Sequence, residues 1–282
     1  IMVREGQAVV QCGVQLMNYN QHWFSGLNVV EYFFWFKSRL HYHGTRGAVP
    51  LGGNTAFMER RLLEWIGGWD DRCLTEDADL GIRLSAAGVP MRLVYDDRHV
   101  TREETPHTIP DFIRQRTRWD QGFIQVLGKG DWWQLRTWRQ RLLALYTLVF
   151  PIFQATMMLY LPIAVVLMFA VKVPVLVAMA SALPLYMVAV QYLISVVALR
   201  EFVAAHHLKR HRMATLKMTI GFFPYQWILA YSAMRAVWRQ LRSVNTWEKT
   251  THTGAHRSGD AAPAAARTPG APGSDVPARV QA

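Results

Sequence analysis

The sequence predicts an α/β domain followed by membrane helices, and three observations lead to this fold class. Short helix-like and strand-like segments alternate through residues 1–104, as they do in layered α/β domains. The stretches 142–171 and 173–199 are apolar, and each exceeds the roughly 20 residues that a bilayer span needs. The net charge is +11, and clusters of arginine and lysine flank the apolar stretches.

The position of the cations separates two classes of partner. A basic chain that binds nucleic acid carries its Lys and Arg residues as a patch or stripe on a folded domain. Here the cations stand directly before and after apolar stretches, which is typical of the cytoplasmic flanks of membrane helices. We therefore expect membrane lipid as a partner and no nucleic acid. Cys12 and Cys73 are too few for a disulfide framework, so we expect two buried thiols.

Turn residues and periodicity define the elements of the α/β part. Gly67 and Gly68 end one predicted helix, and Thr75 and Gly88 bound another as N-cap and C-terminal stop. The expected elements are a strand at 7–16, a helix at 23–40, a loop into a strand at 48–58, a helix at 59–69, a helix at 75–88 and a strand at 91–97.

Residues 108–127 predict an amphipathic helix with Pro110 in its first turn. Because cations and apolar residues alternate along it just before the first apolar stretch, we expect it to lie at a membrane surface. Gln115, Arg118 and Trp119 share one face of this helix, since they are three and four positions apart. Arg114 and Arg116 point elsewhere, and we expect them to contact lipid or solvent.

A third apolar segment, 214–238, is a weaker candidate for a span because Pro224 lies inside it. Three spans would put the C-terminal tail on the opposite side of the membrane from residues 1–140. The cations Arg235 and Arg239 favour the same side. The sequence alone leaves open whether this segment spans, re-enters or lies at the interface. After about residue 257, small residues and proline predict a disordered tail.

Two acidic residues begin the predicted helix at 75–88. Glu76 and Asp77 lie where free backbone N–H groups stabilise carboxylates. Such residues often only cap a helix, but a carboxylate at a helix start that faces a cleft can also act as a general base. Arg118 and Trp119 leave a similar choice between lipid headgroup contacts and a binding surface for phosphate and a sugar ring.

The order of short motifs resembles the membrane-embedded, processive family 2 glycosyltransferases, which include cellulose, hyaluronan, chitin and poly-N-acetylglucosamine synthases. The motifs are G-G-N-T, G-G-W-D, T-E-D and Q-R-T-R-W, followed by apolar spans. The resemblance covers roughly residues 1–250. It implies part of a GT-A type nucleotide-sugar transferase domain at 1–104, interface helices at 105–141, a transmembrane region at 142–240 and a cytoplasmic tail at 241–282.

The resemblance also implies roles for the T-E-D and Q-R-T-R-W residues. Asp77 corresponds to the general base that deprotonates the acceptor hydroxyl, and Glu76 and Thr75 shape its surroundings. Arg118 corresponds to the residue that holds the donor diphosphate. Trp119 corresponds to the residue that stacks on the acceptor sugar at the mouth of a channel, and Gln115 completes the motif.

Two further segments take part in the same resemblance. Gly52, Gly53 and Asn54 are similar to the loop that lines the acceptor pocket, and two glycines permit close backbone approach. Trp247, Lys249 and Thr250 are similar, more loosely, to a segment that closes over the nucleotide. The second similarity requires a cytoplasmic tail, although the same residues also fit a basic stretch beside the membrane.

The resemblance implies a D-x-D motif that holds a divalent metal and comes before the G-G-N-T motif. Residues 1–51 contain no such motif. We expect it upstream, so that Mg²⁺ or Mn²⁺ is bound there and this chain alone supplies no metal ligand. We also expect the chain on its own to bind nucleotide sugar poorly and to be inactive.

The leading hypothesis is an inverting enzyme of the inner membrane, multi-pass with its catalytic part in the cytoplasm. It would move a sugar from a UDP-sugar onto a polysaccharide and export the product. The alternatives are a non-processive enzyme that glycosylates a lipid, and a membrane scaffold or transport component without catalysis. The sequence leaves open the sugar, the linkage and the oligomeric state.

Overall fold

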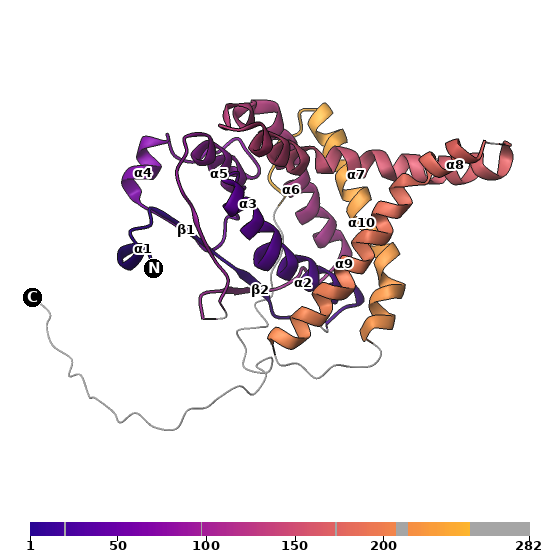
Figure 1. Cartoon of the computed structure of the whole chain (residues 1–282), viewed down its shortest axis with the longest axis horizontal. Coiled ribbons are helices and arrows are strands. Elements are labelled where there is room, and N and C mark those ends of the chain that lie inside the picture. The colour runs from indigo at the N-terminus through magenta and orange to yellow at the C-terminus, as the bar shows by residue number, and fades with distance from the viewer. Residues whose placement is uncertain (20, 97, 173, 207–213, 249–282) are drawn as a thin grey trace, which may run out of the picture.

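The computed structural model describes residues 1–19, 21–96, 98–172, 174–206 and 214–248. Its α/β part occupies the first half of the chain, and long helices form the second half (Figure 1). The elements of the first half are α1 Met2–Glu5, β1 Val9–Cys12, β2 Val14–Leu16, α2 Trp23–Phe34, the π-helical turn η1 Trp35–Arg39, α3 Leu40–Arg46, β3 Ala56–Met58, α4 Arg60–Trp65, α5 Glu76–Ala86, β4 Arg92–Val94 and β5 Thr101–Glu103.

The strands form two small sheets. β1 is central in the first sheet, antiparallel to β3 and parallel to β4, and β2 pairs with β5 in parallel in the second. All four residues of β1 are buried, as is usual for a strand covered on both faces. Gly13 lies between β1 and β2. A side chain is not tolerated at this position, because its Cβ atom would come within 2.7 Å of the Tyr95 ring. The predicted α/β class is confirmed, and its single strand at 7–16 is two strands.

The predicted helices and cysteines of this part agree with the structure. α4 is followed by Gly67 and Gly68, whose φ angles of 89° and 74° favour glycine. α5 begins directly after Thr75, as predicted. Cys12 and Cys73 are both free and buried.

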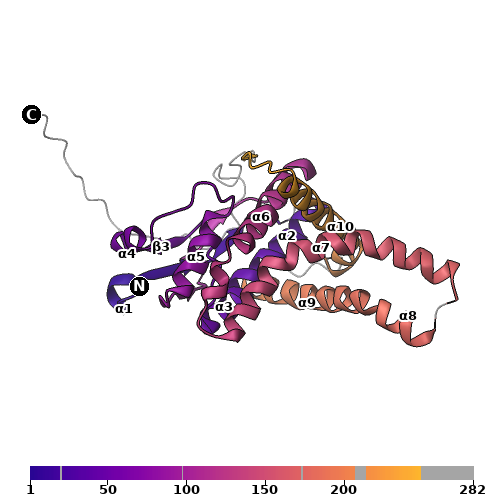
Figure 2. The same cartoon turned by 90° about the horizontal axis from the view of Figure 1, so that it is seen from above.

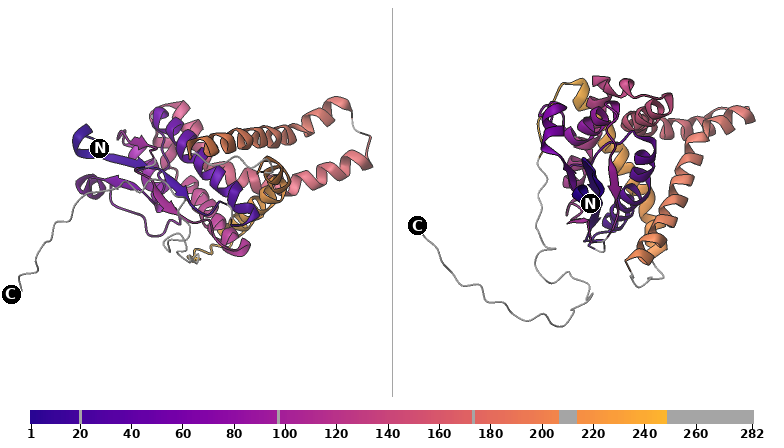
Figure 3. Two further views of the ribbon diagram at one scale, coloured as in Figure 1. Left: turned by 90° about the horizontal axis from the view of Figure 1, so that it is seen from below. Right: turned by 60° about the vertical axis from the view of Figure 1, so that its left-hand side comes forward.

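The second half contains long helices. They are α6 Ile109–Lys129, the 3₁₀ turn η2 Asp131–Gln134, α7 Trp138–Ala170, α8 Val175–Ser181, α9 Leu183–Ala205 and α10 Ala214–Leu241. α7, α8 and α9 form a hairpin that projects from one side of the molecule (Figure 2). α6 and α10 pack beside each other, and α10 also packs on α7. The hairpin contacts the α/β part directly as well, because α9 packs on α2, and Figure 3 shows its far end projecting from the rest of the protein.

α6 lies inside the protein, so its apolar side is not free to contact lipid. Phe112 is fully buried and belongs to a cluster with residues of α2 and α10, such as Phe24 and Phe222. Val126, near the other end of α6, packs with Leu148 of α7. The sequence made α6 look like a surface helix because α10, which covers its apolar face, follows about 100 positions later in the chain.

Within the described residues, α7 and α9 are long and apolar enough to cross a membrane. α7 continues through Pro151 and Pro162, so neither proline divides it. Ala155 is the last buried residue of α7. α10 does not pass the same length and hydropathy test, and one of its faces packs on α6 and α2. Whether the segment 214–238 spans, re-enters or lies at the interface stays as open as the sequence left it.

Two glycines let α5 fit tightly between its neighbours. A Cβ atom on Gly81 would lie 2.3 Å from the carbonyl oxygen of Val49 and 2.5 Å from the amide nitrogen of Leu51. A Cβ atom on Gly122 of α6 would lie 2.4 Å from the side chain of Thr75. These contacts fix α5 against the loop before β3 on one side and against α6 on the other.

We expect the substitution Gly81→Ala to destabilise the protein by about 1–3 kcal/mol, because the backbone it would strike cannot rotate away. Thermal unfolding of the purified protein in detergent measures this effect. Gly128→Ala in α6 is the control, since a Cβ atom there has no neighbour within 4 Å. The control should be neutral or stabilise by up to about 1 kcal/mol through helix propensity. Equal losses in the two variants would contradict the packing argument.

Candidate active site

A cleft of about 2440 Å³ joins the α/β part to the long helices. One end is lined by the motif residues, and the other end is lined by apolar residues of α7, α9 and α10. The predicted site residues that line it are Gly52, Gly53, Asn54, Thr75, Glu76, Asp77, Gln115, Arg118, Trp119 and Trp247. Lys249 and Thr250 lie outside the described residues.

Asp77 occupies the first turn of α5, at the motif end of the cleft. Its Oδ1 accepts a hydrogen bond of 2.8 Å from the amide of Ala78, and the amide of Gly53 also donates to this carboxylate. Burial nevertheless raises the pKa of Asp77 to about 6, and the neighbouring Glu76 contributes to the increase. An aspartate with this pKa is deprotonated at neutral pH and accepts a proton more readily than an exposed one.

The loop that faces Asp77 is held by Gln11, a residue that the sequence analysis did not select. Its Nε2 donates to the carbonyl of Asn54 at 2.9 Å, and its Oε1 accepts from the amide of Gly52 at 2.9 Å. Gly53 fits against Asp77 because a Cβ atom there would lie 3.1 Å from the Asp77 Oδ2. A buried glutamine within the apolar strand β1 is the signal that could have indicated this role.

Three buried polar atoms of residues that line the cleft lack hydrogen-bond partners among the described residues. They are the hydroxyl of Thr75, the Oε1 of Gln115 and the Nε of Arg116, whose residues are 6%, 7% and 9% exposed. Thr75 occupies the N-cap position of α5, but its side chain makes no cap hydrogen bond. Gly122 of α6 packs closely against this side chain, although the N-cap position of Thr75 is as predicted. The Oε1 of Gln115 is available to a ligand.

The segment that follows α10 returns to Arg118. The guanidinium of Arg118 stacks 4.4 Å from the centre of the Trp247 ring and donates to the carbonyl of Glu248 at 3.0 Å. Glu248 in turn forms ion pairs with Arg235 and Arg239 of α10, at 2.5 and 2.8 Å. Burial lowers the pKa of Arg118, but arginine keeps its charge at any physiological pH.

Arg116 is buried, contrary to the expectation that it contacts lipid or solvent. Its guanidinium pairs with Glu31 of α2 at 2.7 and 2.9 Å and also donates to Asn28. Tyr225 of α10 donates to the same Glu31 carboxylate at 2.5 Å. The sequence holds one indication of this pair, because Glu31 is the single charged residue of the mostly apolar segment 23–36.

Trp119 lies beside Tyr32 of α2, with ring centres 5.8 Å apart. The Arg116 guanidinium is 5.0 Å from the Trp119 ring. The next residue, Asp120, also lines the cleft and was not selected from the sequence. Burial raises the pKa of Asp120 to about 7, although the charge of Arg116 opposes this increase. Two aromatic rings and polar groups at their edges are suited to a sugar, which has apolar faces and hydroxyl rims.

The described residues do not by themselves fit a divalent cation. Among them, no three His, Cys, Asp or Glu side chains lie together in a way that could hold a metal ion. Asp77 accepts backbone amides, and Glu31 is occupied by Arg116 and Tyr225. The Mg²⁺ or Mn²⁺ that the resemblance implies stays a prediction, as does its upstream D-x-D motif.

The structure combines an α/β part, a cleft and two helices that are long and apolar enough to cross a membrane. Sequence comparison identifies the family. The family model described as Glycosyl transferase family group 2 matches residues 2–194, so the chain belongs to this family.

Three relatives illustrate the range of the family. The "Probable glycosyltransferase YdaM" of Bacillus subtilis is 37% identical over 79 residues, which are 28% of this chain and 18% of that protein. A UDP-forming cellulose synthase of Dictyostelium discoideum is 28% identical over 40% of this chain and 11% of its own length. The "Beta-monoglucosyldiacylglycerol synthase" of Synechocystis is 33% identical over 29% and 16%, respectively. The chain thus matches less than a fifth of the length of each of these relatives.

We expect Glu31→Gln to cost about 2 kcal/mol of stability, because it leaves the Arg116 guanidinium, 11% exposed, without a counter-charge. This expected loss of stability already allows for screening by solvent, because the Glu31 side chain is 40% exposed. Chemical or thermal unfolding of the intact protein in detergent measures it. Lys37→Gln is the control on the adjoining turn, since its pair with Glu201 is long, 3.8 Å, and exposed, and should contribute about 0.5 kcal/mol or less.

Proposed function

We propose that the intact protein transfers a sugar from a UDP-sugar to the end of a growing polysaccharide, with inversion at the anomeric carbon, and passes the product into the membrane. One observation carries this proposal. A single cleft contains Asp77, Arg118 and Trp119 at one end and continues along α7, α9 and α10 at the other. Such continuity fits a product that lengthens at the site and moves away along the helices.

In the proposed reaction, the acceptor sugar stacks on Trp119, beside Tyr32, with one hydroxyl directed at Asp77. Asp77 takes the proton of this hydroxyl, whose oxygen forms a bond with the anomeric carbon of the donor. The bond from that carbon to the diphosphate oxygen breaks, and UDP leaves with the electron pair. Arg118 offsets the charge that develops on the diphosphate. Trp247 lies over Arg118 and closes the donor side of the cleft.

In the proposed topology, α7 and α9 cross the membrane. α10 packs against α6 and does not cross the membrane. An even number of spans returns the chain to the side from which it started. This agrees with the contact between Arg118 and the segment after α10, and it puts both on the cytoplasmic side, where UDP-sugars are found. The cations Arg235 and Arg239 then lie on the side that the charge rule favours.

A lipid acceptor is the second candidate function. The walls that α7, α9 and α10 give to the cleft are predominantly apolar and would accommodate an acyl chain. One relative is also named for the synthesis of a glycolipid. The two functions differ in the product, which is a polymer in one and a lipid with a single added sugar in the other.

The first test supplies labelled UDP-glucose and UDP-N-acetylglucosamine, separately, to membranes that contain the intact protein with Mg²⁺ or Mn²⁺. We expect label in polymer from one donor, and Asp77→Asn should lower this transfer by about 10²–10⁴-fold, since an amide cannot accept the proton. Asp71→Asn, in the exposed turn after α4, is the matched control. Transfer that survives Asp77→Asn would rule out Asp77 as the base. A non-catalytic scaffold would also be unaffected by this substitution.

The raised pKa of Asp77 predicts how the reaction depends on pH. Transfer should fall as the pH drops through about 6, because the protonated carboxyl no longer accepts the acceptor proton. The ionised, buried Asp77 also destabilises the folded state above its usual pKa of 3.8, so Asp77→Asn should not lower the melting temperature at pH 7. A pH profile of initial rates and a melting curve check the two statements. A rate that persists unchanged to pH 4.5 would contradict the first statement, and a lower melting temperature of Asp77→Asn at pH 7 would contradict the second.

The stacking of Trp247 on Arg118 predicts a specific effect on the donor. Trp247→Ala should raise the KM for the UDP-sugar by about 3–10-fold, in keeping with a cation–π contact, and should change kcat much less. Trp238→Ala is the control, because Trp238 stacks with Arg242 on an exposed face of α10 away from the cleft. Initial rates over a range of donor concentration separate KM from kcat, and an unchanged KM would remove Trp247 from the donor site.

A further inference from the structure

Asp120 is a carboxylate of the cleft that the proposed reaction does not use. It lies in the middle of α6, directly after Trp119, and lines the same cleft. It is half-buried, and it makes no hydrogen bond or ion pair with any residue in the described ranges. Arg116, one turn earlier, donates to Glu31 and Asn28 and not to Asp120. The protein thus leaves this carboxylate open to the cleft.

Asp120 is unfavourable for the fold in three respects. Aspartate is a poor helix former, and this position is too far from the start of α6 to cap the helix. A half-buried carboxylate without a partner loses hydration and gains no hydrogen bond in return. Burial raises the pKa of Asp120 to about 7, although the charge of Arg116 opposes this increase. Positions that break local rules without a gain in packing are expected at functional sites.

Trp119 separates two sides of α6. Residues two positions apart on a helix point in nearly opposite directions, whereas residues four apart lie on the same face. Arg118 stacks with Trp247 on one side, which is the proposed donor side. Arg116 and Asp120 are four positions apart and share the other side. Asp120 therefore lies at the edge of the proposed acceptor site that points away from the donor diphosphate.

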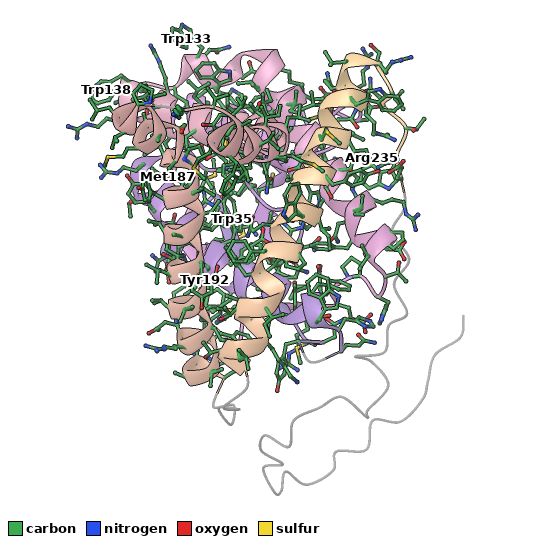
Figure 4. All side chains as sticks on the ribbon, turned by 90° about the vertical axis from the view of Figure 1, so that its right-hand side faces the viewer. Trp35, Trp133, Trp138, Met187, Tyr192 and Arg235 are labelled. Carbon is green, nitrogen blue, oxygen red and sulfur yellow. The ribbon has the colours of Figure 1, made fainter. Side chains whose placement is uncertain are left out.

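The surroundings of Asp120 on this side are aromatic. Tyr32 lies beside Trp119, and Trp35 of η1, one turn later, also lines the cleft. Viewed from the hairpin, Trp35 lies between α9 and α10 (Figure 4). Arg39, a further cation of the cleft, stacks on Trp35 and forms no ion pair with Asp120. An unpaired carboxylate beside aromatic rings is suited to the hydroxyl groups of a sugar that stacks on those rings.

We infer that Asp120 determines which acceptor sugar is used, because its carboxylate accepts hydrogen bonds from hydroxyl groups at the edge of the ring that stacks on Trp119. The inference rests on the proposed function and adds a specificity-determining residue to it. An ionised carboxylate only accepts hydrogen bonds, and two neighbouring hydroxyls can donate to its two oxygens. A sugar without one of these hydroxyls leaves the carboxylate unpaired, and sites built on such hydrogen bonds reject close analogues.

The test follows two successive additions by the intact enzyme in membranes. In the first addition, the polymer receives one unit from a modified form of the UDP-sugar that serves as donor. One ring hydroxyl of this unit, other than the one that is glycosylated, is replaced by hydrogen. The second addition supplies the labelled natural donor, and its rate on the modified end is measured. Each hydroxyl is replaced in turn, in the wild type, Asp120→Asn and Asp120→Ala.

We expect the wild type to extend the natural end about 10–100-fold faster than an end that lacks a hydroxyl bound by Asp120, the effect of one hydrogen bond to a charged group. In Asp120→Ala the two ends should be extended at rates within about threefold of each other, because the natural hydroxyl has also lost its partner. Both variants should melt at the wild-type temperature or above, since they remove an unpaired, half-buried charge.

Asp111→Asn is the matched control on the same helix. Asp111 is buried, pairs with Arg114 and lies outside the cleft. The control should lower the melting temperature, because it removes one charge of a pair, and should keep the wild-type preference for the natural end. A structural aspartate and a specificity-determining one thus give opposite patterns of stability and selectivity.

Three results would overturn the inference. The first is a wild-type preference below threefold for every hydroxyl, and the second is a preference that Asp120→Ala leaves unchanged. The third is a lower melting temperature in both Asp120 variants, which would make the residue structural. These results leave the proposed polymerase intact. If the wild-type enzyme instead adds a single sugar to lipid or transfers none, the proposed function fails, and the role of Asp120 fails with it.

Discussion

The buried pair of Arg116 and Glu31 is the interaction on which the arrangement of the long helices depends. Arg116 belongs to α6, Glu31 to α2, and the hydroxyl of Tyr225 brings α10 to the same carboxylate. A charge pair removed from water gives little net stability, but it permits few alternative arrangements, because any displacement leaves a charge unpaired. The pair therefore specifies which faces of the three helices meet. The same guanidinium lies against Trp119, so the tryptophan is positioned by the pair that joins the helices.

The surroundings of Asp77 illustrate how tight packing creates reactivity. Gly81 and Gly122 bring the loop before β3 and α6 so close to α5 that the helix is buried from Ala78 to Ile82, and Asp77 just before this stretch is half-buried. The backbone amides of Gly53 and Ala78 stabilise the carboxylate, but they do not outweigh the loss of hydration. The resulting pKa of about 6 is a product of packing between elements, and no property of the T-E-D motif alone requires it.

The sequence predicted local elements well, because turn glycines, apolar periodicity and helix caps act over a few residues. It also predicted the family, since several short motifs followed one another in a specific order. It missed contacts between distant segments. Arg116 was expected at a lipid surface because Glu31 and Tyr225 lie 85 and 109 positions away. Gln11 escaped notice because its partners are in the loop at residues 52–55. Thr75 holds the N-cap position that the sequence predicted, but nothing local reveals that Gly122 of α6 packs against its side chain.

The length of α7 has a consequence for the path of the product. A continuous helix of 33 residues is about 50 Å long, whereas the hydrocarbon core of a bilayer is about 30 Å thick. As a membrane span, α7 would therefore stand partly outside the lipid or tilt strongly, and the buried residues before Ala155 mark the part that is clamped to the α/β domain. If transfer takes place beside Asp77, as proposed, α7 would hold the site of bond formation at a set height above the membrane. A newly added sugar would then enter the bilayer directly from the cleft, and the thickness of the host membrane would set how well the length of α7 matches the lipid.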